Sequence, residues 1–161
     1  VYNSEDELVL KASQKMFKAK ESFSFKDEED KPVFNVDAEN VLDFSGDYTL
    51  TDAENEEAFA VLEKEFTVFQ HRWKVKTPDG DHVASITSRS SALDFLRGFS
   101  ELAALIPHKY SIETPEGKEL GEIKGELSLK DKYTISIDKA KNIPKEALIA
   151  AAITADALEG D

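Results

Sequence analysis

Residues 73–86, WKVKTPDGDHVASI, contain two short runs in which apolar and polar residues alternate, separated by a polar turn. Alternation with a period of two is typical of a half-buried β-strand. Asp79-Gly80, between the runs, is typical of a hairpin turn, because glycine readily adopts the positive φ that a tight turn needs. The stretch therefore predicts a β-hairpin.

The same unit recurs along the chain. Five segments begin with an aromatic residue and then alternate: residues 23–27, 48–52, 73–77, 110–114 and 133–137. Polar turns follow the first four, at 27–32, 52–57, 77–81 and 114–118, and second strands follow these turns at 33–36, 58–62, 83–86 and 120–123. Successive aromatic residues lie 25, 25, 37 and 23 positions apart. A near-constant step predicts one repeated supersecondary unit, and short strands at this spacing favour an all-β sandwich or barrel.

Two segments depart from the strand pattern. Residues 91–106 open like a capping box, carry apolar residues at helical spacing and are followed by Pro107, which predicts an amphipathic surface helix inserted between the third and fourth hairpins. Residues 144–159 begin with a proline, and in their apolar stretch only Thr154 and Asp156 are polar. A helix that is apolar all round must be buried, yet this one is too short to span a bilayer.

An all-β chain that ends in a buried helix has one economical architecture. We predict a single domain, residues 1–161, that is mainly β. It forms a closed antiparallel β-barrel of roughly 10–12 strands around the helix at 144–159, or a curved sheet wrapped around that helix. A helix packed under an open sheet is the alternative. Additional strands are expected near residues 8–13 and around 41–44. Within the helix we expect these side chains to be buried: Leu148, Ile149, Ile153 and, as a hydrogen-bonded polar group, Asp156.

Composition narrows the classes of function. The 33 acidic and 20 basic residues give a net charge of −13. Such a charge disfavours nucleic-acid binding and broad adhesion to anionic membranes, which depend on Lys and Arg. The absence of cysteine excludes thiol catalysis, disulfides and cysteine-bound metal. No apolar run is long enough for a membrane helix and no segment reads as a signal peptide, so we expect a cytoplasmic protein.

The three histidines, His71, His82 and His108, form no metalloprotease helix pair, and no nucleophile elbow or phosphate-binding glycine loop accompanies them. His71 and His82 flank one predicted hairpin, but histidines beside a turn are more often strand residues that face solvent than metal ligands. The acidic runs at 27–30 and 52–56 lack the spacing of a calcium loop and are better explained as hairpin turns. We therefore expect no catalytic residues, no bound metal and no cofactor.

One short strand is rich in positive charge. Strand alternation places Arg72, Lys74 and Lys76 on one face of the strand. The apolar Trp73 and Val75 lie on the opposite face. Cations spaced about 7 Å apart along a strand can bind a phosphate or a carboxylate. Cross-strand pairing with acidic residues, on a face that only adds solubility, is the alternative interpretation.

The linkers between the hairpins also match one another, at residues 15–27, 65–75 and 126–135. Repeated hairpins followed by an apolar, alanine-rich helix that contains an Asp resemble the LURP-one-related family, part of a tubby-like group that includes the phospholipid scramblases. The resemblance covers nearly the whole chain, from about residue 8 to 158. It implies a twelve-stranded barrel threaded by the C-terminal helix.

The resemblance implies less about function. Tubby proteins bind phosphoinositide headgroups through basic residues on barrel strands beside a surface helix, so this site would fall on Arg72, Lys74 and Lys76, with Arg97 on the inserted helix. LURP-one-related proteins have no general activity assigned to them. This chain departs from the lipid-acting members in its negative net charge, and no apolar anchor or acidic calcium loop follows the last helix.

Together these observations predict a non-enzymatic binding module whose ligand is anionic, for example a phospholipid headgroup. The alternative is a protein-interaction scaffold that uses the inserted helix at 91–106 and binds no small molecule.

Overall fold

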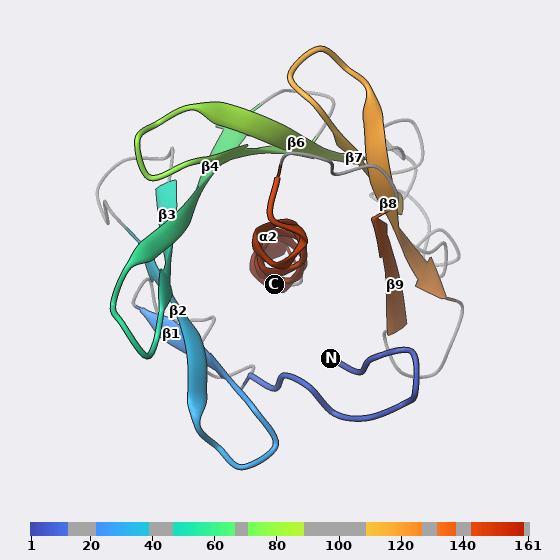
Figure 1. Cartoon of the computed structure of the whole chain (residues 1–161). Helices are drawn as coiled ribbons and strands as arrows, with labels where there is room; N and C mark the ends of the chain where they lie inside the picture. Colours follow the sequence, from blue (N-terminus) through green and yellow to red (C-terminus); the bar gives the residue numbers. More distant parts are fainter. Residues whose placement is uncertain are drawn as a thin grey trace.

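The computed structural model of the chain describes residues 1–12, 22–38, 47–66, 71–88, 109–126, 132–137 and 143–159. These residues form one nine-stranded antiparallel sheet and one α-helix (Figure 1). The elements are β1 (Phe23–Lys26), β2 (Pro32–Ala38), β3 (Asp47–Asp52), β4 (Ala58–Phe66), β5 (His71–Lys76), β6 (His82–Ser88), β7 (Lys109–Glu113), β8 (Glu119–Glu126), β9 (Lys132–Ile137) and α2 (Lys145–Glu159). Each strand pairs with the next along the chain. The nine strands that the repeat predicts are all present, which confirms a mainly β fold.

Three of the four hairpins share one kind of turn, and the fourth is a longer form of it. In β5–β6 the Thr77 N–H donates to the Asp81 carbonyl and the Gly80 N–H to the Thr77 carbonyl, both at 2.9 Å. Gly80 has φ 93°, in the left-handed region that favours glycine. The β1–β2 and β7–β8 hairpins make the equivalent backbone bonds, and the β3–β4 turn is one residue longer, with the Asp52 N–H donating to the Glu57 carbonyl and the Glu56 N–H to the Asp52 carbonyl. The residues at their left-handed positions are Asp30, Glu56 and Gly117.

A β-bulge follows each of these turns at the same place. In β5–β6, Val75 pairs with Ala84 but Lys76 pairs with His82, so Val83 has no direct partner across the ladder. The register shifts in the same way in the other three hairpins. The extra residues there are Val33, Phe59 and Leu120. A bulge sets two residues of one strand opposite one of the other and so changes which side chains share a face. The β-bulge is therefore part of the repeated hairpin unit.

Alternation along the strands builds the core on the inner face of the sheet. Four of the aromatic residues that mark the repeat lie there: Phe23, Trp73 and Tyr110 are buried, and the Tyr48 ring lies 5.9 Å from that of Trp73. Burial raises the pKa of the Tyr48 hydroxyl above its usual value. Gly121 also occupies an inner position, where an added Cβ would come 2.1 Å from the Ser136 carbonyl oxygen. The two neighbouring strands thus approach too closely there for any side chain.

Helix α2 packs into the same core. In Figure 1 it is seen end-on with the strands curving around it, and it contacts β4, β5 and β9. Leu148 is fully buried and Ile153 nearly so, whereas Ile149 is 38% exposed, contrary to the expectation of complete burial. Ile149 shares its side of the helix with the exposed Lys145 and Glu146, four and three positions earlier. The first turns of the helix therefore have a side that faces away from the sheet.

The sheet is not closed into a barrel. Among the described residues no pairing joins β9 to β1, so the prediction of a closed barrel is wrong for this part of the chain. Residues 1–12 lie on the open side between these two strands in Figure 1. They form isolated bridges rather than a strand, and only Lys11 pairs with β1, through two backbone hydrogen bonds to Lys26. A single bridged residue pair is too short to add residues 1–12 to the sheet as a strand.

Other predictions fall outside the described residues. These are the strand around 41–44, the inserted helix at 91–106 and the side chain of Asp156. In the part of the chain that is described, no helix has the length and apolar character needed to cross a membrane.

Candidate functional site

The candidate site is the outer face of β5, near the middle of the sheet. Trp73 and Val75 point into the core and are buried, which sets the side chains of Arg72, Lys74 and Lys76 on the opposite face. The three basic side chains are 26–38% exposed. The structure thus brings the three predicted cations into one row, within reach of solvent.

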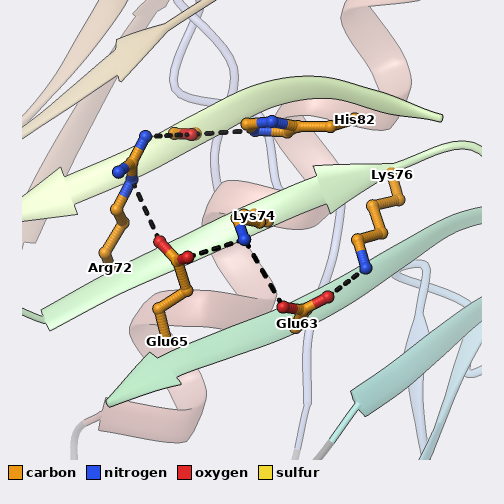
Figure 2. A network of polar contacts seen from close by, with 7 residues as sticks. Glu63, Glu65, Arg72, Lys74, Lys76 and His82 are labelled. Atoms are coloured by element: carbon orange, nitrogen blue, oxygen red, sulfur yellow. Dashed lines mark hydrogen bonds and ion pairs between the residues drawn. The ribbon is translucent and has the colours of Figure 1, made fainter. Parts of the chain in front are cut away.

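The neighbouring strand β4 provides carboxylates to this row (Figure 2). The antiparallel register sets Glu65 opposite Arg72. The Glu65 carboxylate lies 3.3 Å from Arg72 Nε through Oε2 and 2.6 Å from Lys74 Nζ through Oε1. One carboxylate is therefore shared by two cations.

Glu63 repeats this arrangement two positions earlier on β4. It lies opposite Lys74, with 3.6 Å between Glu63 Oε1 and Lys74 Nζ, and its other oxygen accepts a hydrogen bond from Lys76 Nζ. Positive and negative groups thus alternate in a ladder of three cations and two carboxylates, whose formal charge is +1. We call these five side chains the charge ladder: Glu63, Glu65, Arg72, Lys74 and Lys76.

The ladder shifts the pKa values of two of its members, Glu63 and Lys74. The hydrogen bond from Lys76, with the positive charges of Lys76 and Lys74, holds the pKa of the Glu63 carboxyl below its usual value, although partial burial opposes this. The hydrogen bond to Glu65, with the negative charges of Glu65 and Glu63, raises the pKa of the Lys74 ammonium. Both pKa shifts favour the charged forms of Glu63 and Lys74.

Strand β6 extends the polar network on its other side. Arg72 Nη2 donates a hydrogen bond to Ser85 Oγ at 3.1 Å, and His82 Nε2 lies 2.9 Å from the same oxygen (Figure 2). Positions 82 and 85 would lie on opposite faces of a regular strand. The bulge at Val83 removes that difference, because His82 then pairs with Lys76 and Ser85 with Lys74. Ser85 is fully buried and fixes one end of the Arg72 guanidinium.

Comparison with protein-family models gives a match to the LURP-one-related model over residues 8–156. The chain belongs to the LURP-one-related family. Comparisons with curated proteins and with solved structures gave no match. The match confirms the family suggested by the hairpin repeat and the apolar helix.

The predicted Arg97, and the histidines considered and set aside from the sequence of this LURP-one-related protein, are only partly covered by the structure. Arg97 and His108 lie outside the described residues, and the side chain of His71 is not described. In the described ranges, no group of three His, Asp or Glu side chains could hold a metal ion. Glu63, Glu65 and Ser85 are the site residues that the sequence did not single out.

Proposed function

We propose that this LURP-one-related protein is a non-enzymatic binding module whose anionic ligand docks on the outer face of β5. A phospholipid headgroup is the ligand class that the tubby-like resemblance favours. The observation that carries the proposal is the row of Arg72, Lys74 and Lys76 in a chain whose net charge is −13. The inner face of the sheet is occupied by the core into which α2 packs, so binding takes place on the outer face.

The chemistry of the row suits an anion with several oxygen atoms. An ammonium group has three N–H donors and a guanidinium has five, which is more than the carboxylates and Ser85 occupy in the contacts described above. Arg72 presents a planar fork that matches the geometry of a phosphate. Because all three side chains are partly exposed, an anion can reach these donors from solvent.

Vesicle binding tests the proposal. The probe is phosphatidylcholine vesicles with and without phosphatidic acid, and the variants are Arg72→Gln with Lys74→Gln and, more strongly, Arg72→Glu with Lys74→Glu. Lys124→Gln is the matched control, because Lys124 is a surface lysine of β8 that also bonds to a carboxylate, that of Glu122. We expect wild type and the control to bind, and the double variants to lose about tenfold or more of the affinity.

A thermal melt of each variant shows whether the fold survives. The glutamine pair adds no negative charge beside Glu63 and Glu65, so it serves where the glutamate pair fails to fold. The proposal is wrong if wild type binds no phosphorylated headgroup, or if a folded double variant binds as wild type does.

A further inference from the structure

We infer that Glu63 and Glu65 act as built-in competitors that restrict the site to phosphate monoesters and reject singly charged anions. This inference rests on the proposed function of the β5 face. It assigns a role in specificity to two carboxylates that lie between the cations, and it names the chemical class of the ligand.

The carboxylates already hold the positions that a ligand needs. Glu65 contacts both Arg72 and Lys74, and Glu63 contacts both Lys74 and Lys76. An incoming anion must displace these oxygens or share the cations with them. Because the carboxylates are tethered to β4, they compete without the loss of translational freedom that a free ligand incurs.

Charge decides which anions can succeed. The ladder has a formal charge of +1, so a phosphodiester or a carboxylate that replaces Glu65 exchanges one negative charge for another of equal size. Such a ligand gains little Coulomb energy to offset its lost freedom. A phosphate monoester has a charge of about −1.5 to −2 near neutral pH and three acceptor oxygens, so it attracts the cations more strongly than the carboxylate does.

Arg72 provides the geometric part of this selection. Ser85 Oγ accepts from Arg72 Nη2 at 3.1 Å, and the buried Ser85 is fixed on β6. A guanidinium held in this way can donate two parallel hydrogen bonds to a terminal phosphate group, which offers more oxygen atoms than a diester linked on both sides. The positioning of Arg72 and the competition by the carboxylates therefore favour the same ligand class.

The test compares vesicles that contain phosphatidic acid, a monoester, with vesicles that contain phosphatidylserine, a diester, at matched surface charge. The variant is Glu63→Gln with Glu65→Gln, and Glu122→Gln is the matched control because it removes a β8 carboxylate that is bonded to a lysine. Each carboxylate lost from the ladder raises the affinity for a singly charged headgroup by roughly 3- to 50-fold, the Coulomb effect of one charge at about 7 Å. A titration with glycerol 3-phosphate in place of vesicles shows whether a soluble monoester is also bound.

We expect wild type and the Glu122 variant to bind phosphatidic acid about tenfold more tightly than phosphatidylserine, and the Glu63/Glu65 variant to gain affinity for phosphatidylserine, which wild type binds weakly. Glycerol 3-phosphate that binds wild type points to a soluble ligand of the same class, and binding to vesicles alone points to a lipid. An unchanged affinity for phosphatidylserine in the folded Glu63/Glu65 variant, or in folded Glu65→Gln alone, overturns the inference. If the Arg72/Lys74 variants still lose binding in that case, the proposed function stands; if they bind as wild type, both fail.

Discussion

The hairpin turns allow a quantitative test of the repeat. Two of the four left-handed positions hold glycine, Gly80 and Gly117, and two hold residues with a side chain, Asp30 at φ 67° and Glu56 at φ 60°. A side chain in this region costs about 1–2 kcal/mol because Cβ approaches the following carbonyl oxygen. Asp tolerates the region better than Glu does, because its short side chain can bond to the local backbone.

The magnitude for Glu56→Gly follows from two opposing terms. Relief of the backbone strain stabilises the folded chain by about 1–2 kcal/mol, and the greater freedom of glycine in the unfolded chain costs about 0.4–1 kcal/mol. We therefore expect a net gain of about 0.5–1 kcal/mol in the free energy of unfolding, and a smaller gain for Asp30→Gly. Conversely, Gly80→Ala should cost about 1 kcal/mol through backbone strain alone, because an added Cβ meets nothing within 4 Å.

Urea denaturation of wild type and of the Glu56→Gly, Asp30→Gly and Gly80→Ala variants measures these differences in the free energy of unfolding. Glu56→Gln is the control. That variant removes the same negative charge but keeps a side chain at the left-handed position, so we expect it to lack the gain. The reasoning fails if Glu56→Gly destabilises the protein, if Glu56→Gln stabilises it equally, or if Gly80→Ala has no effect.

Three further outcomes are expected. Thr154→Val should raise the free energy of unfolding by about 1 kcal/mol, because Thr154 Oγ1 is buried on α2 without a hydrogen-bond partner among the described residues; a loss measured in urea would contradict this. Gly121→Ala should lower it by about 3 kcal/mol or prevent folding, since the new Cβ would clash with the Ser136 carbonyl, and a near-neutral result would show that the strands separate easily. Because the pKa of Glu63 is lower in the folded chain, its contribution to stability is present above the unfolded value of 4.5 and is lost as pH falls through the folded pKa. Melts across this pH range should therefore show a shallower acid loss for Glu63→Gln than for wild type, and equal slopes would refute the assignment.

The sequence predicts the strands well because their signal is local. Alternation, a polar turn and an aromatic marker lie within one hairpin, so each unit can be found without knowing its neighbours. The bulges depend on how two strands pair, and no feature of Val83 or Phe59 alone marks them. Ile149 shows a related limit: a helix that is apolar on all sides does not reveal which side faces away from the sheet.

The candidate site shows the same division between local and non-local information. Alternation suffices to place Arg72, Lys74 and Lys76 on one face. Their pairing with Glu63 and Glu65 depends on the register between β4 and β5, which are joined through residues 67–70. A shift of one residue would turn both carboxylates to the inner face, so the ladder depends on how β4 and β5 are paired.

The distribution of charge explains how a strongly acidic chain can still offer an anion site. The antiparallel order sets the four hairpin turns at one end of the sheet, and residues 27–31, 52–57, 77–81 and 114–118 contain eleven acidic and two basic side chains. Their charge of −9 is most of the total of −13, so the repulsion of anions is concentrated at that end. The charge ladder lies on the strand face, where the local charge is +1. Beyond a Debye length of about 8 Å salt screens the repulsion from the turns, whereas contacts within the ladder are screened less. An anionic surface can therefore approach the face of β5 at physiological ionic strength even though the chain as a whole is negative.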